Sequence, residues 1–363
     1  MKILILGGTG AIGISLVDIL ADKGNKIYVT SRRTIPPKKK GICYIKGDAH
    51  NLDFMVSILK ENYDVIVDFM SYLFEEFENR YELLLSSTSQ YIFLSSARVY
   101  AESEQLLTEE SARLIDTIGD KQYLSTREYA LEKAREEILL INSRYKNWTI
   151  VRPYITYNIE RLQLGVLEKE HWLYRALHGR TIVFSEDIAD KITTLIYGYD
   201  VALRISKLIG NKLALEEIYQ ITAGHSIKWE MVLKIYLDTL QKLTGNRPNI
   251  LMIKNSDGIA NILGNYYQIK YDRMYNRIFD SSKINKMIEN KESYKEIEDG
   301  LKMCITEFYN GKRKFREISW KLEAYFDRQT KERVKFTEIP EVKQKLKYLI
   351  YRYTPILEFR KGK

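Results

Sequence analysis

Short apolar runs alternate with stretches of helical periodicity along the first half of the chain. Five runs have the length and composition of buried strands, and they cover residues 2–6, 26–30, 41–45, 64–68 and 90–94. Apolar runs without alternation indicate parallel strands that helices cover on both faces. The pattern predicts an α/β fold of the Rossmann type, with a doubly wound parallel sheet.

The first strand leads directly into a glycine-rich turn, and an apolar helix follows from Ile12 to Leu20. In such a turn Gly7 permits a tight bend, Gly10 lets backbone amides approach a pyrophosphate, and Gly13 allows close packing of helix on strand. The helix N-terminus favours an anion there. We predict that a dinucleotide binds to this turn through Gly7, Thr9, Gly10, Ala11, Ile12 and Gly13.

The residues after the second strand bear on the choice of cofactor. No Asp or Glu occurs between Lys26 and Lys40, and the run Ser31-Arg32-Arg33 stands where NAD-binding folds carry an acidic residue. An arginine there accommodates a 2′-phosphate, so NADP is favoured and NAD is the alternative. Asp48, after the third strand, is predicted to meet the adenine. Asp68 ends the fourth strand, at the edge where ligands bind in open α/β sheets.

Tyr129 and Lys133 are four residues apart, which places both side chains on one face of a helix. A lysine beside a tyrosine lowers the phenol pKa from about 10, so that the phenol exchanges a proton near neutral pH. The chain holds 27 tyrosines, so this spacing alone is weak evidence. A serine at 95 or 96, after the fifth strand, either binds a substrate oxygen or caps the turn.

Several motifs occur in an order that resembles the extended short-chain dehydrogenase/reductase family, in its nucleotide-sugar epimerase/dehydratase branch. They are Gly7-x-x-Gly10-x-x-Gly13, Ser95-Ser96-x-x-Val99-Tyr100, Tyr129-x-x-x-Lys133, Val151-Arg152-Pro153, Asp200-Val201-Ala202 and Phe279-Asp280-Ser281. The resemblance covers roughly residues 1–310 and implies a smaller C-terminal substrate-binding domain after the Rossmann-type sheet. It implies that Ser96, Tyr129 and Lys133 form a catalytic triad, with Tyr129 and Lys133 also contacting the cofactor.

Two departures from the family pattern limit the reaction. Ala97-Arg98 stand where the family's sugar 4,6-dehydratases have Asp-Glu, which disfavours dehydration. Asp68-Phe69-Met70-Ser71 replaces the usual His-Leu-Ala-Ala and resembles a divergent subgroup. We therefore expect hydride transfer on a nucleotide-linked sugar, by a 4-epimerase or a ketosugar reductase. The alternative is a non-catalytic dinucleotide-binding protein with a regulatory or RNA-binding role.

The expected domain division follows the same resemblance. Residues 1–155 and about 191–224 form the dinucleotide domain, 156–190 and 225–310 form the substrate domain, and 311–363 form an extension. Arginine pairs bidentately with phosphate oxygens, so arginines are the expected substrate-binding residues, with a solvated surface position as the alternative for each. They are Arg98, Arg175, Arg273 and Arg277.

All of the excess charge lies in the extension. Residues 311–363 hold 16 Lys and Arg against 7 Asp and Glu, so their net charge of +9 equals that of the whole chain. The sequence after Pro340 predicts a short amphipathic helix. Such a basic segment attaches to an anionic membrane surface or to polyanions, or it packs on the substrate domain with its lysines in water.

Composition indicates a cytoplasmic protein. No apolar run approaches the ~18–20 residues that span a bilayer, and Cys43 and Cys304 are expected to be reduced. The four histidines show no metal-ligand spacing, so we expect no metal. The expected partners are a nucleotide-sugar substrate, a second copy of the chain and the anionic surface, with no specific nucleic acid.

Overall fold

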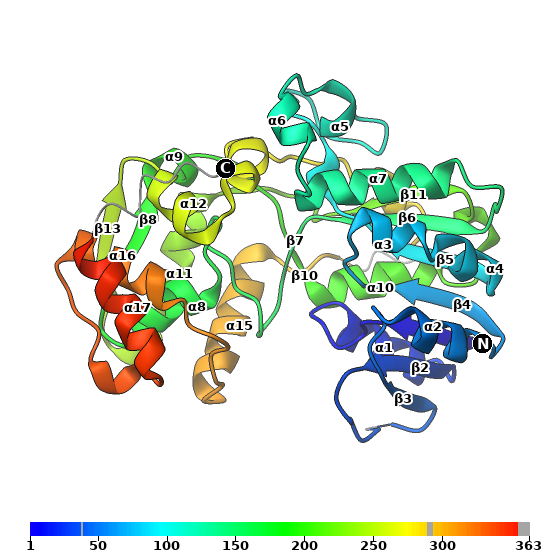
Figure 1. The fold of residues 1–363 in the computed structure, drawn as a ribbon, viewed down its shortest axis with the longest axis horizontal. Coiled ribbons are helices and arrows are strands. Elements are labelled where there is room, and N and C mark those ends of the chain that lie inside the picture. The colour runs from blue at the N-terminus through cyan, green and yellow to red at the C-terminus, as the bar shows by residue number, and fades with distance from the viewer. Residues whose placement is uncertain (38, 289–292, 355–363) are drawn as a thin grey trace. The chain divides into compact units, whose positions relative to one another are not determined.

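The computed structural model describes residues 1–37, 39–288 and 293–354 (Figure 1). The chain divides into two compact units. The first unit contains residues 1–156, 194–225 and 278–295, and the second contains 157–193, 226–277 and 296–363. The last part of the basic extension, residues 355–363, lies outside the described residues.

The first unit is built on a seven-stranded sheet in the order β11-β6-β5-β4-β1-β2-β3, and every neighbouring pair is parallel. This confirms the predicted Rossmann-type fold. The five predicted strands are present, and the first has the predicted limits. The strands are β1 Lys2–Leu6, β2 Lys26–Ser31, β3 Ile42–Lys46, β4 Tyr63–Asp68, β5 Thr88–Leu94, β6 Trp148–Pro153 and β11 Glu217–Ile221, and the short strands β7 Ile155–Tyr157 and β10 Leu195–Tyr197 stand outside this sheet.

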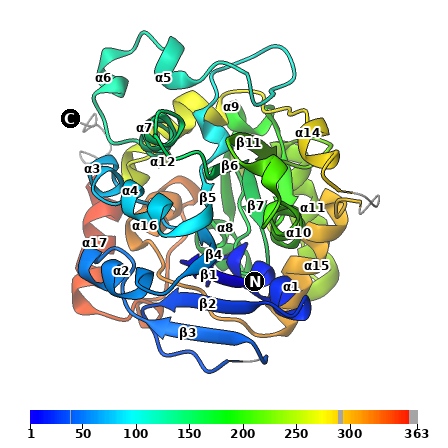
Figure 2. The ribbon, with the colours of Figure 1, turned by 90° about the vertical axis from the view of Figure 1, so that its right-hand side faces the viewer.

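Helices cover both faces of this sheet (Figure 2). Ile3 and Ile5 of β1 point into a core with α1 and α10, whereas Leu4 and Leu6 point into the opposite core with α2, α3, α4 and α7. Both faces are therefore apolar, which is why the strands read as continuous apolar runs. The helices of this unit are α1 Gly13–Asp22, α2 Leu52–Leu59, α3 Phe74–Glu78, α4 Tyr81–Ser86, α5 Leu114–Thr117, α6 Lys121–Leu124, α7 Tyr129–Ile141, α10 Gly198–Leu208 and α14 Ser282–Asn285.

The order of the strands reverses at β1, which lies between β2 and β4. After β3 the chain returns across β1 to form β4, β5 and β6 on its other side. The carboxyl ends of β1 and β4 meet where the Phe69 backbone N–H donates to the Leu6 carbonyl at 3.0 Å. Ligands of open α/β sheets bind at such a reversal, at the carboxyl ends of the strands.

The second unit is mostly helical. The indole of Trp172 stacks on the ring of Tyr236 with centroids 4.2 Å apart, which joins α8 to α11 in its core. Its strands form two pairs, β8 Ile182–Ser185 with β13 Ile250–Ile253, and β9 Ile192–Thr193 with β12 Ile227–Lys228. Its helices are α8 Lys169–Leu177, α9 Glu186–Ala189, α11 Trp229–Thr244, α12 Asp257–Leu263, α13 Tyr266–Gln268, α15 Ile297–Asn310, α16 Trp320–Thr330 and α17 Val342–Tyr353.

Two parts of the observed division differ from the one expected from the sequence. Residues 278–295 belong to the first unit, because the backbone N–H of Asp280 donates to the Leu107 carbonyl at 2.9 Å. The described part of the extension belongs to the second unit, and α16 buries Trp320, Leu322 and Phe326. In the described residues no helix has both the length and the hydrophobicity that a membrane span requires.

Candidate active site

The glycine turn after β1 has the geometry that its sequence predicts. Gly7 adopts a φ of +68°, which side chains disfavour, and its N–H donates to Thr30 Oγ1 at 3.1 Å. A Cβ atom on Gly13 would lie 2.6 Å from the backbone of Gly8, so the start of α1 packs directly on the turn. A Cβ on Gly10 would meet no atom within 4 Å, so Gly10 faces open space. An anion would have room at this position.

The carboxyl ends of β2 and β3 bring the candidate adenosine-binding residues to the same edge. Ser31 pairs with Lys46, and the Gly47 N–H donates to the Ser31 carbonyl at 2.9 Å. Arg32 and Arg33 are exposed just beyond β2, and Ser31 Oγ accepts from the Arg33 N–H at 3.1 Å. Asp48 is also exposed, and its Oδ1 accepts from the His50 N–H at 3.1 Å.

Tyr129 is the first residue of α7, and its ring is 37% exposed. The guanidinium of Arg98 lies 5.3 Å from the centre of this ring and forms an ion pair with Glu128, the residue before the helix. Ser96 Oγ in turn accepts from the Arg98 backbone N–H at 3.2 Å. The structure thus places Ser96 and Arg98, from the end of β5, beside Tyr129.

Lys133 lies one turn after Tyr129, and its side chain is buried. Its Nζ donates to the carbonyl of Met70, just beyond β4, at 3.2 Å. The sulfur of Met70 lies 3.0 Å from the position of a Cβ atom on Gly7. Met70 therefore touches both the glycine turn and the lysine, so these two sequence motifs meet at the reversal point of the sheet.

A second buried charge engages Lys133. Its Nζ also donates to Glu136 Oε2 at 2.9 Å, and Glu136 is fully buried. Burial raises the pKa of Glu136 to about 7, although the ammonium of Lys133 opposes this shift and Asp68 adds to it. The pKa of Lys133 is raised, because Glu136 and Tyr129 outweigh the effect of its own burial.

Asp68 ends β4, as the sequence predicts, and its side chain is engaged inside the fold. It is completely buried, and its carboxylate accepts from the hydroxyls of Tyr91 at 2.8 Å and Tyr72 at 3.1 Å and from the Met70 N–H at 2.9 Å. Burial raises its pKa. Asp68 therefore fixes the segment after β4, and its contact with the cofactor stays a prediction.

Comparison with known proteins is consistent with this geometry. Residues 3–159 match the family model described as NAD dependent epimerase/dehydratase family. The match spans β1 to β7 and includes the glycine turn, Ser96, Tyr129 and Lys133.

Solved structures of low sequence identity share the fold. The NAD complex of dTDP-glucose 4,6-dehydratase from Bacillus anthracis has a TM-score of 0.65 at 16% identity, over 86% of this chain and 97% of that one. The UDP-glucose 4-epimerase of Thermus thermophilus in complex with NAD has a TM-score of 0.62 at 15% identity, over 85% and 99%.

A curated relative carries a different description. The chloroplast stem-loop binding protein of 41 kDa b of Arabidopsis thaliana is 28% identical over 248 residues, which is 64% of this chain. The match spans 61% of that protein's length.

The first unit also contains a buried ion pair that none of the sequence predictions includes. Arg152 of β6 forms two hydrogen bonds with Glu137 of α7, at 2.8 and 2.7 Å, and its Nη1 donates to the hydroxyl of Tyr100 at 3.1 Å. Ser95 also donates to Glu137. This network ties α7 to the end of β5 and so fixes the neighbourhood of Ser96. Two features of the sequence could have indicated this network. Arg152 belongs to the motif Val151-Arg152-Pro153, and Glu137 follows Lys133 by four residues.

Three arginines expected to bind a diphosphate are instead buried inside the second unit. Arg175 donates to Glu323 at 3.0 Å, to Asp327 at 2.9 Å and to Glu332 at 2.8 Å. Both of the others pair with Asp272, and each also donates to a carbonyl, Arg273 to that of Gly165 at 3.0 Å and Arg277 to that of Tyr271 at 3.0 Å. These contacts leave the three side chains buried in the fold rather than exposed, and substrate binding by Arg175, Arg273 and Arg277 stays a prediction.

The remaining sequence predictions concern the cysteines and Arg98. Cys43 and Cys304 are both free, as expected, with Cys43 exposed on β3 and Cys304 buried in α15. Arg98 is the one of the four predicted substrate-binding arginines that lies beside Tyr129. Its role in substrate binding stays a prediction.

Proposed function

We propose that this chain is an NAD(P)-dependent oxidoreductase or epimerase that acts on a nucleotide-linked sugar, as a 4-epimerase or a ketosugar reductase. The observation that carries the proposal is the contact of Met70 with both Lys133 and the glycine turn. It brings the motif that binds dinucleotides next to the motif that moves protons. The family of residues 3–159 and the fold of nucleotide-sugar enzymes support the same conclusion.

The residues of the first unit suit a nicotinamide dinucleotide. The open space at Gly10 and the N-terminus of α1 would receive its pyrophosphate, and Lys133 would hold the nicotinamide ribose. When bound, the cofactor supplies the centre that accepts or donates a hydride. In the proposed mechanism Tyr129 exchanges the proton of the sugar hydroxyl, Ser96 orients the sugar oxygen, and Arg98 binds the anionic part of the substrate.

The proposed cofactor is NADP, with NAD as the alternative. Arg32 and Arg33 are exposed at the end of β2, where a guanidinium can reach a 2′-phosphate. Net reduction of a ketosugar suits an exchangeable NADPH, whereas epimerisation needs NAD that is retained through both half-reactions. The choice of cofactor and the choice of reaction are therefore linked.

A non-catalytic role is the second candidate, and one observation favours it. Glu136 neutralises Lys133, so the charge that should assist Tyr129 is partly cancelled. The name of the Arabidopsis relative, a stem-loop binding protein, adds the possibility of a nucleic-acid ligand. The proposed partners of the enzyme are a nucleotide sugar, a second copy of the chain, and an anionic surface contacted by residues 311–363.

Mass spectrometry of the small molecules that copurify with the protein tests the proposal first. A dinucleotide with a nucleotide sugar is the expected result. UDP-glucose with NAD⁺ or NADP⁺ then serves as a first probe of hydride transfer. The absorbance of the reduced cofactor and an analysis of the sugar products report the reaction.

Tyr129→Phe should lose about 10²–10⁴-fold in rate and keep its dinucleotide affinity. Tyr199→Phe, at another exposed tyrosine of the same unit, is the matched control and should leave the rate unchanged. A Tyr129→Phe variant that turns over substrate at the wild-type rate would support the non-catalytic candidate instead.

A further inference from the structure

Helix α17 carries a stripe of exposed apolar side chains. Val342, Leu346, Ile350 and Tyr353 are each between 50% and 73% exposed. Their spacing of four, four and three residues places them on one face of the helix. Large apolar side chains gathered on one exposed face mark an interaction surface more often than isolated ones do.

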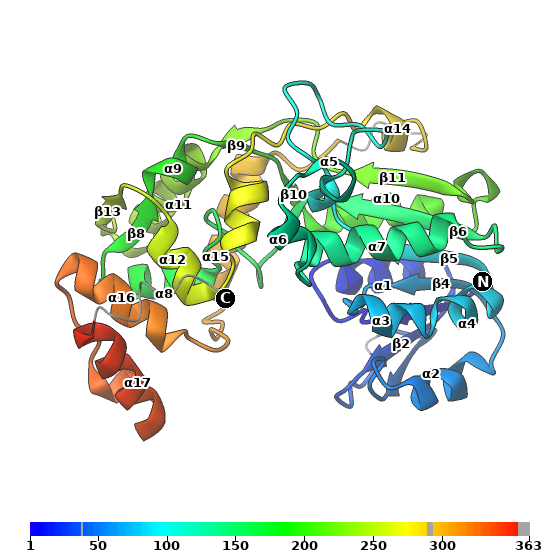
Figure 3. The ribbon, with the colours of Figure 1, turned by 45° about the horizontal axis from the view of Figure 1, so that its top comes forward.

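The opposite face of α17 is fixed to the second unit. The Tyr348 hydroxyl, which is buried, donates to Asp327 Oδ2 of α16 at 2.6 Å and accepts from the Val334 N–H at 3.2 Å. Figures 1 and 3 show α17 lying beside α16. The helix therefore presents its apolar stripe outward in a fixed orientation.

The charges of α17 have a single sign. The helix contains Lys343, Lys345, Lys347 and Arg352 and no acidic residue. At 100° per residue, Lys343 and Lys347 follow one side of the stripe, and Lys345 and Arg352 follow the other. An apolar stripe between two basic edges is the pattern of helices that lie in the interface of an anionic bilayer.

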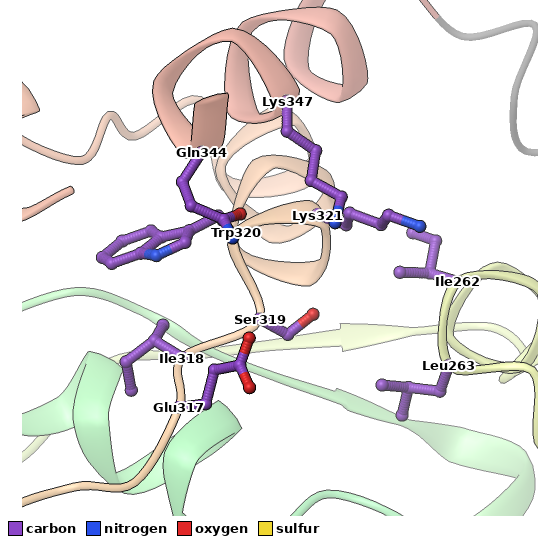
Figure 4. A pocket seen from close by; sticks show the side chains of 9 residues that line it. All are labelled: Ile262, Leu263, Glu317, Ile318, Ser319, Trp320, Lys321, Gln344 and Lys347. Atoms are coloured by element: carbon purple, nitrogen blue, oxygen red, sulfur yellow. The ribbon is translucent and has the colours of Figure 1, made fainter. Parts of the chain in front are cut away.

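A pocket of about 370 Å³ lies next to the edge that carries Lys347. Figure 4 shows Lys347 extending from α17 toward Lys321, while Glu317 and Ser319 lie on the opposite side. The ammonium of Lys321 also lies 5.2 Å from the ring centre of Tyr351 on α17. Two lysines thus gather positive charge beside the stripe, where a lipid phosphate group would be attracted.

We propose that α17 docks on an anionic lipid surface, with Leu346 and Ile350 inserted among the headgroups and its basic residues on the lipid phosphates. This inference specifies the anionic surface proposed above for residues 311–363, and it does not depend on the dinucleotide site. Nucleic acid fits less well, because aliphatic side chains have no partner on a phosphate backbone. A second copy of α17 fits less well too, because the pairing would bring together two helices that are both purely basic.

Co-sedimentation of the full chain with lipid vesicles tests the proposal. Wild-type protein should bind vesicles that contain phosphatidylserine at low salt and lose this binding at high salt. It should not bind vesicles of phosphatidylcholine alone. Leu346→Ser with Ile350→Ser should weaken binding by roughly tenfold or more, because two apolar insertions are lost. Lys343→Glu with Lys347→Glu should weaken it on the order of 100-fold.

The matched control is Leu213→Ser, at an exposed leucine outside α17, which should bind like the wild type. All changed positions on α17 are exposed or half-exposed, so the melting temperatures should agree within error. Wild-type protein that ignores anionic vesicles, or a Leu346→Ser, Ile350→Ser variant that binds them normally, would overturn the proposal.

A labelled RNA stem-loop, measured by fluorescence anisotropy, provides the competing probe. Tight stem-loop binding without vesicle binding would assign the basic charge to nucleic acid and overturn lipid docking. Dinucleotide affinity, measured in the same variants, should stay unchanged. If the wild-type protein binds no dinucleotide, the proposed function is contradicted. The vesicle result is then judged separately.

Discussion

Lys133 and Glu136 form a buried ion pair, with Nζ and Oε2 2.9 Å apart and both side chains out of contact with water. The lysine that is proposed to assist Tyr129 is thus held by a carboxylate three residues further along the same helix. Glu136 is surrounded by Asp68 of β4, Tyr91 of β5, and Glu132 and Lys133 of its own helix. The charge of this cluster at neutral pH depends on whether Glu136 holds a proton.

Glu136 should make the stability of the protein depend on pH. Its pKa is raised from 4.5 to about 7 in the folded state, so the contribution to stability is fully present below about pH 4.5 and is lost as pH rises through 7. Glu136→Gln cannot ionise. Relative to wild type, its free energy of unfolding should therefore rise between pH 5 and pH 8, by at most about 3 kcal/mol.

Urea denaturation at several pH values measures this difference. Glu132→Gln is the control on the same helix, because Glu132 is also buried but accepts from the Phe74 N–H and pairs with Arg135. Parallel curves for wild type and Glu136→Gln would show that Glu136 does not titrate in this range.

Gly10→Val should abolish most dinucleotide binding without unfolding the protein. A side chain at Gly10 would meet no atom of the chain within 4 Å, so the fold can accept it, but it would occupy the space proposed for the pyrophosphate. Gly119→Val is the control, since Gly119 also faces open space and lies outside the turn. Isothermal titration calorimetry with NAD⁺ and NADP⁺ should show loss of binding in Gly10→Val alone. Equal dinucleotide affinities in the two variants would show that the dinucleotide does not bind at this turn.

Arg32→Ala should reduce a preference for NADP(H) over NAD(H) by about 1–3 kcal/mol, the size of a hydrogen bond to a charged group. The physical reason is the loss of a guanidinium beside the 2′-phosphate, which NAD(H) lacks. Arg144→Ala, at an exposed arginine just after the C-terminal end of α7, should change neither affinity. If the wild type binds NAD(H) more tightly, then Arg32 and Arg33 are ordinary surface residues and epimerisation becomes the favoured reaction.

The sequence predicts the first unit well, because its signals are local. The continuous apolar run at residues 2–6 is β1, and the spacing of Gly7 and Gly13 requires the turn that follows. The two-residue strands β9 and β12 are too short to leave a periodic pattern in the sequence. Residues 278–295 carry no local sign that they join the first unit, because their contacts are with residues far earlier in the chain.

Only part of the site could be predicted, because some of its contacts depend on burial and on residues far apart in the sequence. Lys133 and Tyr129 are recognised by their spacing, but the spacing of Lys133 and Glu136 also occurs on many solvated helix surfaces. Only the fold reveals that this pair is buried beneath the end of β4. In the same way, an exposed and a buried arginine look identical in sequence, and Arg175 finds its partners about 150 residues later.

Arg175 should be among the residues on which the second unit depends most. Its guanidinium is fully buried and pairs with Glu323 and Asp327 of α16 and with Glu332 beyond it, so it fastens the extension to α8. Truncating it removes the paired charge of the buried Asp327 and leaves Glu323 only the ion pair with Arg180 at 3.5 Å. Breaking a buried ion pair typically costs about 3–5 kcal/mol. Arg175→Met should therefore lower the free energy of unfolding by about this amount in urea denaturation.

Arg247→Met is the matched control, because Arg247 pairs with Asp238 on an exposed surface, where an ion pair contributes about 0–1 kcal/mol. Dinucleotide affinity should survive in Arg175→Met wherever the first unit stays folded, since Arg175 lies in the other unit. A variant that keeps wild-type stability but loses affinity for a nucleotide sugar would restore Arg175 as a substrate-binding residue. We expect the opposite result, because each of its donors is already engaged by the side chains of α16, by Glu332 and by the carbonyl of Thr181.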